Sequence, residues 1–526
     1  MANRESIKAK NTTHCKKGVT EPIQKHKNIL NLIQKMKTSG FAIKKLIICL
    51  LSVGISTAAL SQERLSKRDY LKDYDLFQSL FEQVNSGLYR YHPKEKVDSL
   101  FRINRQKITE STSYRDFYNL VWEVIDFTGS IHNNLDYPDS LKIRLNREKI
   151  FFPLPLRYLE KKLIVNADFK DLKTGDEILS INGIEAQDFA KTVGHYRSTD
   201  GHNTTEKYAF IQTKKLADYI YYAFGKQDEF LIHYQSNGKN KQTILPAVAF
   251  KTFEEQHKNR FIPEYEEEEE ALYFFRFLEG NIGYLRVSSF AIGVEGSPEY
   301  KTFSAFLEYV FKDLKYHKSK NLIVDIRGNA GGIDPNESLL FAYMTDRKFK
   351  ENTSAYTLTQ KFPFPEQLRL KGFSLEELEE AAKERHNDYR EGKYFQNQEY
   401  NPVWSPKENR FTGNLYMLID PFVASAASHY AAMVKSDRKA VVVGQETGGG
   451  YYGHTGHYNI TYQLPETGLL LSFSVVNFEQ DVRELSDQKQ GQGIMPDHEV
   501  QQTIEGYLNH TDKALEYIKR LIKNEN

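Results

Sequence analysis

Cysteine is nearly absent from this sequence. The chain of 526 residues has two, Cys15 and Cys49, and both lie in the first 61 residues. The remainder therefore has no disulfide, no thiol nucleophile and no zinc site with cysteine ligands. A chain of this length builds large hydrophobic cores unaided, so secretion without disulfides is physically reasonable.

The chain also carries almost no net charge. The 71 Lys and Arg residues balance 70 Asp and Glu residues, which gives a formal net charge of +1. No basic stripe interleaved with aromatic residues occurs, so nucleic acid is not expected as a partner. His454 and His457 lack the helical H-E-x-x-H pattern of a metalloprotease and are predicted to be loop residues. No metal ion and no cofactor are expected.

An apolar run at residues 46–60 follows two lysines and precedes small residues. This combination is typical of a secretory signal peptide, and the run is short for a membrane span. We therefore assign 1–61 to a leader and expect a mature chain that starts near Gln62. The protein would be exported to the periplasm, the cell surface or the exterior of a bacterium. An uncleaved anchor helix is the alternative, and the long basic stretch before the run leaves open whether Met1 or Met36 is the start.

Periodicity and turn residues divide the rest of the chain into a multidomain α/β protein. Apolar residues recur at helical spacing up to about residue 127, and short strand-like runs follow. A charged insertion with an expected helix at Leu375–Tyr389 is either a lid or tolerated surface. The predicted parts are a helical N-terminal domain at 62–135, a β-rich domain at 141–248, a core at 273–505 with the insertion 350–407, and a C-terminal helix at 506–526.

Ser425 stands where a predicted strand turns into a predicted helix. The apolar run 414–419 precedes it, and a stretch rich in alanine and methionine follows as far as Val434. Backbone N–H groups at such a junction lack helical partners, and the positive end of the helix dipole lies close by. A nucleophile that builds an oxyanion beside itself benefits from this position. An N-cap is the common alternative role.

A second strand–turn–helix unit is predicted at residues 320–344. Its turn contains Gly328, Gly331 and Gly332, which leave backbone amides open to a ligand. Asp334 is the predicted N-cap of the helix that follows. No Gly-Lys-Ser/Thr occurs, which excludes a P-loop, and the spacing does not fit a dinucleotide-binding motif. A serine on one unit and open amides on the other favour an acyl-transfer site.

Four segments in order resemble one peptidase family. They are G-N-I-G-Y-L-R-V-S-S-F from Gly280, D-I-R-G-N-A-G-G from Asp325, S-A-A-S from Ser425 with G-Q-E-T-G-G from Gly444, and G-I-M-P-D-H-E-V from Gly493. This set resembles the serine peptidase family of the C-terminal processing (tail-specific) proteases and the tricorn core. The resemblance covers about residues 270–505 and implies a crotonase- or ClpP-like α/β core.

A further segment, G-D-E-I-L-S-I-N-G from Gly175, is similar to a turn of PDZ domains. PDZ domains bind an extended peptide as an added strand. The resemblance implies a PDZ-like domain at 141–248, whereas Gly-Asp and Asn-Gly by themselves mark two tight turns.

One departure separates two branches of this family. The processing proteases use as base a lysine twenty-five residues after the serine, but Gly450 occupies that position here. The tricorn-like branch instead uses a histidine from the region before the core. The resemblance therefore implies His132, in T-G-S-I-H-N-N, as the base. Its ordinary pKa of about 6.5 suits proton transfer near neutral pH. A satisfied surface imidazole is the alternative.

The tricorn-like branch orients its histidine with a glutamate several dozen residues after the serine. Glu484 is the predicted orienting residue among four acidic residues in that window, and solvated surface charge is the alternative. The amides of Ala426 and Gly331, or of Gly332 if the turn is shifted, would form the oxyanion hole.

The predicted function is a secreted serine endopeptidase. Ser425 would attack a peptide carbonyl, with His132 as base and then as acid to the leaving amine. The expected partner is a peptide or an unfolded protein, the membrane is contacted only through the signal segment, and no oligomeric state is predicted. The alternatives are a non-catalytic peptide-binding protein of the same fold and an acyl-thioester enzyme of crotonase-type architecture.

Overall fold

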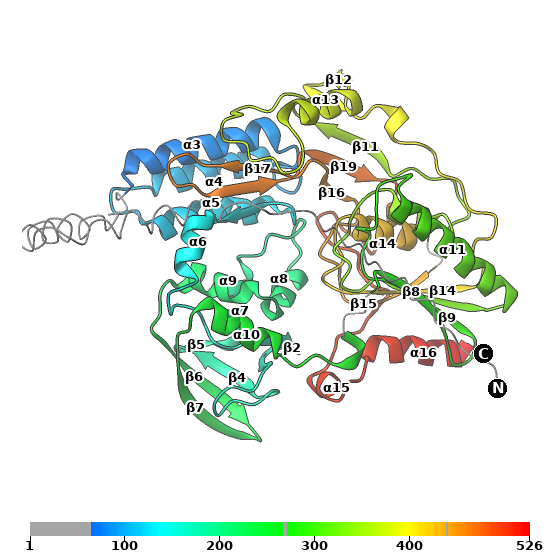
Figure 1. Cartoon of the computed structure of the whole chain (residues 1–526), viewed down its shortest axis with the longest axis horizontal. Helices are drawn as coiled ribbons and strands as arrows, with labels where there is room; N and C mark the ends of the chain where they lie inside the picture. Colours follow the sequence, from blue (N-terminus) through cyan, green and yellow to red (C-terminus); the bar gives the residue numbers. More distant parts are fainter. Residues whose placement is uncertain (1–64, 267–270, 438–439, 526) are drawn as a thin grey trace, which may run out of the picture. The chain divides into compact units, whose positions relative to one another are not determined.

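A sheet of six strands forms the centre of the region around Ser425 (Figure 1). The computed structural model describes residues 65–266, 271–437 and 440–525, so the predicted leader lies outside the described residues. No helix in these ranges is long and apolar enough to cross a membrane. The strands, in spatial order, are β20 (His498–Glu499), β15 (Ala440–Gly444), β14 (Asn414–Ile419), β10 (Asn321–Asp325), β9 (Ile282–Val287) and β8 (Tyr273–Leu278).

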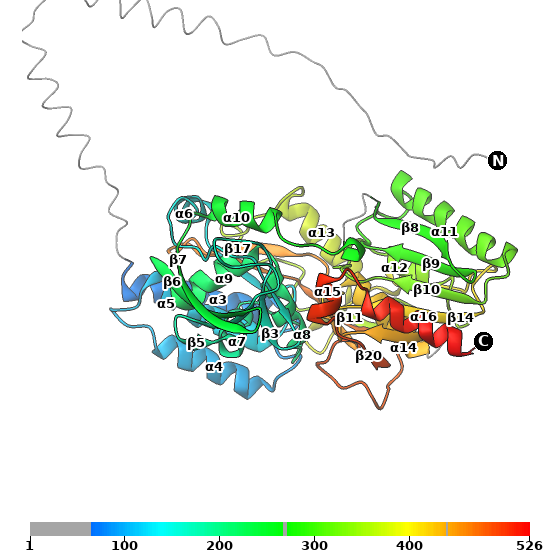
Figure 2. The same cartoon turned by 90° about the horizontal axis from the view of Figure 1, so that it is seen from below.

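Neighbouring strands of this sheet run parallel, except for β8 and β9. One face packs against α11 (Pro298–Tyr316), α12 (Asn336–Phe341) and α14 (Ala426–Asp437), and the other against α16 (Lys513–Glu525). Figure 1 shows α16 below the sheet and α11 and α14 above it, and Figure 2 shows α16 from below. Because both faces are covered, β14 is an almost continuous apolar run, and its predicted bounds are confirmed.

Two predicted helices have different bounds. The C-terminal segment forms α15 (Ile504–Leu508) and α16, because His510 has a φ of +56°, which interrupts a helix. The helix expected at Leu375–Tyr389 ends earlier, as α13 (Leu375–Arg385). The residues that follow instead form a hairpin of β12 (Asp388–Arg390) and β13 (Lys393–Phe395).

The insertion 350–407 is hydrogen-bonded into the core. Its strand β11 (Asn352–Thr357) pairs with β19 (Val476–Gln480), which also pairs with β16 (Gly453–Gly456). Only the 3₁₀ turn η3 (Gln398–Tyr400) follows the hairpin before β14. The start of the insertion is therefore a fixed part of the sheet beside Ser425.

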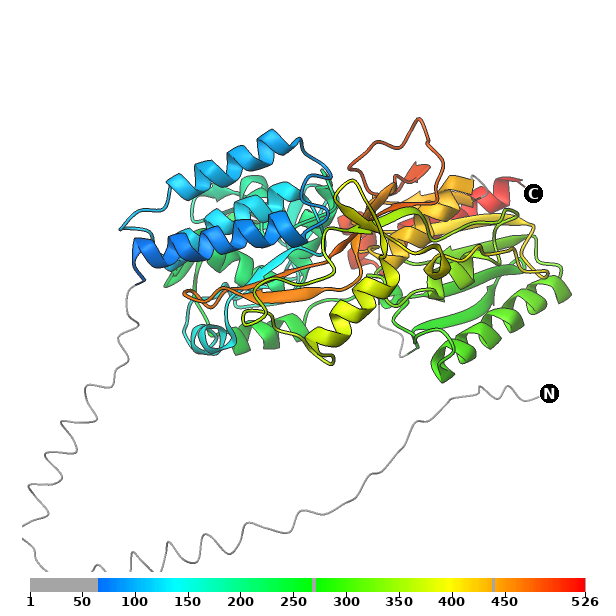
Figure 3. The same ribbon diagram turned by 90° about the horizontal axis from the view of Figure 1, so that it is seen from above.

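The N-terminal helices α3 (Lys67–Val84), α4 (Lys94–Gln106) and α5 (Tyr114–Thr128) share a hydrophobic core with residues 460–475. The short strand β1 (Asn134–Asp136) pairs antiparallel with β18 (Leu470–Phe473), which pairs with β17 (Ile460–Gln463). Figure 3 shows these orange strands beside the blue helix α3. The pairing fixes the chain just after His132 against the core.

Residues 141–248 form a second sheet. Its strands in order are β2 (Leu156–Leu159), β3 (Lys162–Val165), β4 (Glu177–Ile181), β6 (Glu229–Ser236) and β7 (Lys239–Pro246), with β5 (Ile184–Glu185) paired to β4. Asn182 and Gly183 both have positive φ, so the predicted tight turn is confirmed. The helices around it are α6 (Asp139–Leu145), α7 (Ala186–Gly194), α8 (Thr205–Ala209), α9 (Lys215–Phe224) and α10 (Phe250–Lys258), with 3₁₀ turns η1 (Phe210–Gln212) and η2 (Glu264–Glu266).

Candidate active site

Ser425 lies in the turn between β14 and α14 and has a φ of +53°. This left-handed conformation costs a residue with a side chain about 1–3 kcal/mol and is concentrated at functional sites. Strained strand-to-helix turns of this kind expose the nucleophile in other hydrolases. Among the described residues no backbone N–H donates to Ser425 Oγ, whereas Ser428 Oγ donates to the Ser425 carbonyl at 2.7 Å. The side chain is therefore not used as an N-cap.

The glycine turn after β10 lies directly against this serine. A Cβ added to Gly331 would lie 2.7 Å from Ser425 Cβ and 2.9 Å from Ala426 N, so only glycine fits. Two hydrogen bonds hold the units together: Gly328 N donates to Asp420 Oδ1 at 2.9 Å, and Ala424 N donates to Asn329 O at 3.2 Å. The sequence thus places both units at one end of the sheet.

The open amides of the site are those of Gly332 and Ala426. Gly331 N donates to Asn329 Oδ1 at 2.9 Å, so its hydrogen is already engaged. Neither Gly332 N nor Ala426 N donates any of the hydrogen bonds found in the described ranges, and both residues line the pocket of Ser425. The expected preference for Gly331 over Gly332 is therefore reversed, because the Asn329 side chain occupies the first amide.

Ser425 opens into a pocket of about 180 Å³. Gly332, Ala426 and His132 line this pocket as well, so the structure brings together residues that lie far apart in the sequence. Three more histidines and two carboxylates also line the pocket.

His132 comes from the loop between α5 and β1, and Asp200 fixes this loop. Asp200 Oδ1 accepts a hydrogen bond from Ile131 N, and Asp200 Oδ2 accepts one from Gly450 N, both at 3.0 Å. Asp200 is buried, and burial raises the pKa of its carboxyl to about 7. One carboxylate thus joins the histidine loop to the glycine cluster after β15.

The His132 ring is half-buried and, among the described residues, its Nε2 has no hydrogen-bond partner. Its ring centroid lies 6.1 Å from that of His454. Burial, followed by the charges of Arg197 and His457, lowers the pKa of His132 to about 4. The imidazole is therefore neutral at neutral pH and available as a proton acceptor.

No carboxylate in the described ranges is hydrogen-bonded to His132. Glu484 is exposed and does not line the pocket, so the structure does not bring the predicted orienting residue to the histidine. The neighbouring His454 is hydrogen-bonded to Gln480, whose Nε2 lies 3.2 Å from His454 Nδ1.

Gly450 has no room for a side chain. A Cβ added there would lie 2.7 Å from Gly453 O, and the Gly450 amide is bonded to Asp200. A lysine at this position, where the processing branch carries its base, would therefore not fit in this chain.

The sequence did not reveal several polar residues of the pocket. Asp334 is not an N-cap, because α12 begins at Asn336 and the Asp334 carboxylate lies 2.9 Å from His457 Nε2. Glu351 gave no signal, since its contact depends on the pairing of β11 with β19. His429 follows Ser425 by one helical turn, and this spacing alone could have identified it.

A strained serine, two open amides and a neutral imidazole in one pocket are the elements of a serine hydrolase. Residues 281–500 match the model of peptidase family S41. Residues 281–500 are therefore similar to an S41 peptidase domain, and this match together with the site supports a serine-type peptidase.

Solved structures agree with this fold. The structure of mature CPAF in complex with lactacystin has a TM-score of 0.55 and 14% identity, over 86% of this chain and 97% of that chain. The structure of a CPAF mutant has a TM-score of 0.56 and 13% identity, over 86% of this chain and 96% of that chain. No curated protein sequence matches this chain.

Proposed function

We propose that this peptidase is an exported serine endopeptidase that cleaves peptide bonds with Ser425 as nucleophile and His132 as base. The observation that carries the proposal is the single pocket lined by Ser425, His132, Gly332 and Ala426. The positive φ of Ser425 adds to it, because such strain is kept where function requires it.

In the first step Ser425 Oγ attacks the carbonyl carbon, and its proton passes to His132 Nε2. The carbonyl oxygen becomes an oxyanion that accepts hydrogen bonds from Gly332 N and Ala426 N. When the C–N bond breaks, the amine leaves with the proton from His132 and an acyl-serine remains. Water then attacks the ester, again with His132 as base, and frees the acid and the serine.

Labelling with a fluorophosphonate probe tests the nucleophile. The probe should modify the wild type on the peptide that contains Ser425, and Ser425→Ala should abolish both labelling and hydrolysis with little change in melting temperature. Ser474→Ala is the matched control, because Ser474 lines the same pocket and should not be modified. Undiminished labelling of Ser425→Ala would refute the assignment.

A non-catalytic peptide-binding protein is the second candidate. It is favoured by one observation, that no carboxylate in the described ranges is bonded to His132. This candidate predicts that the wild type binds peptides, is not labelled by the probe and loses no binding in Ser425→Ala.

Export rests on the sequence pattern at residues 46–60. When the full chain is expressed in a bacterium, the mature protein should be recovered outside the cytoplasm with an N-terminus near Gln62. An unprocessed chain in the cytoplasm would contradict this part of the proposal.

A further inference from the structure

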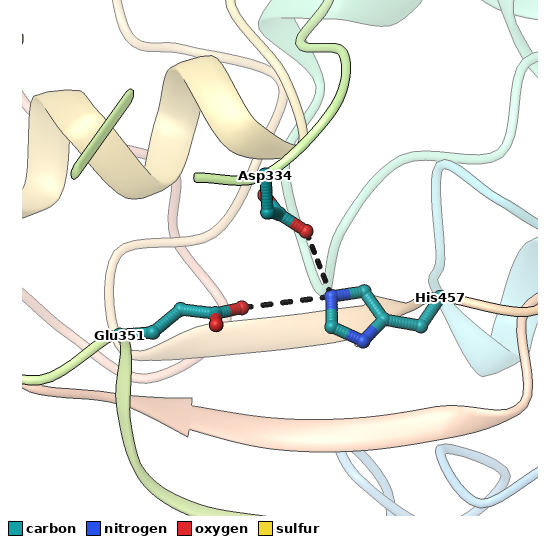
Figure 4. Close-up of side chains that lie close together, drawn as sticks. All are labelled: Asp334, Glu351 and His457. Carbon is teal, nitrogen blue, oxygen red and sulfur yellow. Dashed lines mark hydrogen bonds and ion pairs between the residues drawn. The ribbon is translucent and has the colours of Figure 1, made fainter. Parts of the chain in front are cut away.

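Three side chains from distant segments converge on one wall of the pocket (Figure 4). Asp334 follows β10, Glu351 precedes β11 and His457 follows β16. Figure 4 shows both carboxylates directed at the same ring nitrogen. His457 Nε2 lies 2.9 Å from Asp334 Oδ2 and 3.5 Å from Glu351 Oε1.

These separations suit a shared metal ion. Ligand atoms about 2.0–2.1 Å from a tetrahedral Zn²⁺ lie about 3.3 Å from one another. The two distances from His457 Nε2 bracket that value, and all three ligand atoms lie within 4.8 Å of one another. The side chains are 16–32% exposed, so they are held by the fold and still accessible from the pocket.

Two buried atoms beside the cluster lack partners. His429 Nε2 and Glu337 Oε2 have no hydrogen bond among the described residues, although His429 is 2% exposed and Glu337 is fully buried. Glu337 Oε1 lies 3.6 Å from His429 Nδ1, and His429 lines the same pocket. The polar groups beside the cluster are therefore not fully satisfied among the described residues, as expected next to a site that holds a ligand.

We propose that Asp334, Glu351 and His457 bind one divalent transition-metal ion of the Zn²⁺ type beside Ser425. An imidazole ligand favours zinc and its neighbours in the transition series over magnesium and calcium, which prefer oxygen ligands. Three protein ligands with an open fourth position are typical of accessible zinc sites, and the pocket provides that position. The site goes beyond the proposed peptidase mechanism and departs from the expectation of no metal ion. His457 lies in a loop as predicted, whereas His454 lies in β16 because this segment pairs with β19.

Titration calorimetry with ZnCl₂ and metal-free Ser425→Ala protein tests the site without reference to hydrolysis. One Zn²⁺ per chain should bind, and Glu351→Gln, Asp334→Asn or His457→Gln, each added to this background, should weaken binding by at least about tenfold. His195→Gln is the matched control, because His195 Nδ1 lies 2.9 Å from Asp126 Oδ2 outside the pocket. Equal affinity in the cluster variants, or equal weakening in the control, would overturn the site.

X-ray absorption of the zinc-loaded Ser425→Ala protein provides a second test that needs no substitution in the cluster. The expected protein ligands are one imidazole nitrogen and carboxylate oxygens. A shell with two or more imidazoles would overturn the assignment. Neither readout depends on peptidase activity, so failure of the metal site and failure of the proposed mechanism are distinguishable.

Discussion

His132 and His457 line one pocket but lie in opposite environments. His132 comes from the N-terminal region and its Nε2 has no partner in the described ranges, whereas His457 comes from the core and contacts two carboxylates. Burial disfavours the charged form of both imidazoles and by itself lowers the pKa of each. For His457 the contacts with Asp334 and Glu351 outweigh burial and raise its pKa to about 10.

The two imidazoles therefore differ in protonation state at neutral pH. At neutral pH His132 is neutral and able to accept a proton from Ser425. His457 is protonated between its carboxylates, so the proposed metal ion would have to displace that proton to bind. In the proposed mechanism, the carboxylate neighbours of each imidazole therefore decide whether it is neutral and able to act as base.

Replacing the two histidines separately should give the largest effect. We expect His132→Ala to lower kcat/KM by about three orders of magnitude or more, as for loss of a triad member. His457→Gln should lower it by less than about tenfold, because it removes no proton acceptor. Hydrolysis of a short fluorogenic peptide measures both, with melting temperatures as a check of folding. A larger loss in His457→Gln would reverse the comparison.

Asp200→Asn should give the next largest effect. The amide has one acceptor oxygen where the carboxylate offers two, so either Ile131 N or Gly450 N loses its partner. A small displacement of the His132 loop should lower kcat by about ten- to a hundredfold with little change in KM. Asp176→Asn is the control, because Asp176 is a buried carboxylate that accepts from Lys173 N in a turn of the second sheet. Similar losses in both variants would show a general effect on stability.

The pH profile should show which imidazole titrates. Since His132 accepts a proton only when neutral and its pKa is lowered to about 4, the main decline of kcat/KM should occur well below pH 6.5. If His457 were the base, kcat/KM would instead increase up to about pH 10. The profile is measured in the wild type and in Asp200→Asn, because protonation of Asp200 near pH 7 adds a shallower decline in the wild type alone.

The smallest expected effect on catalysis comes from Gly450. Gly450→Ala should lower the free energy of unfolding by about 1–3 kcal/mol through overpacking against Gly453 O, as measured by urea denaturation. Gly450→Lys, added to His132→Ala, should not restore hydrolysis. Restored activity in that double variant would show that a Ser–Lys mechanism still fits this pocket.

The features that sequence predicts well here are local. The bounds of β14 and the glycine turn follow from an apolar run and from backbone freedom within a few residues. Ser425 was identifiable for the same reason, because its position depends on one strand and the helix after it. His132 required the family resemblance, since nothing in its neighbours indicates proximity to the serine.

The features that sequence missed depend on long-range pairing. Glu351 reaches the pocket only because β11 pairs with β19, and Asp200 only because its loop meets Gly450. The choice between Gly331 and Gly332 depended on where one side chain, Asn329, places its oxygen. Such contacts leave no periodicity or spacing in the sequence.

The attachment of the His132 loop to the core joins an early segment of the chain to a late one. Ser130 Oγ and Thr455 Oγ1, which are 325 residues apart in the sequence, form a hydrogen bond of 2.8 Å. The adjacent strand β1 can pair only after β18 has been synthesised. During synthesis the histidine emerges first and its docking strand among the last, and closing so long a loop is a slow step. In the proposed mechanism, a nascent chain that lacks β18 therefore holds Ser425 without a fixed His132 loop. In that mechanism, proteolytic activity would require the finished fold.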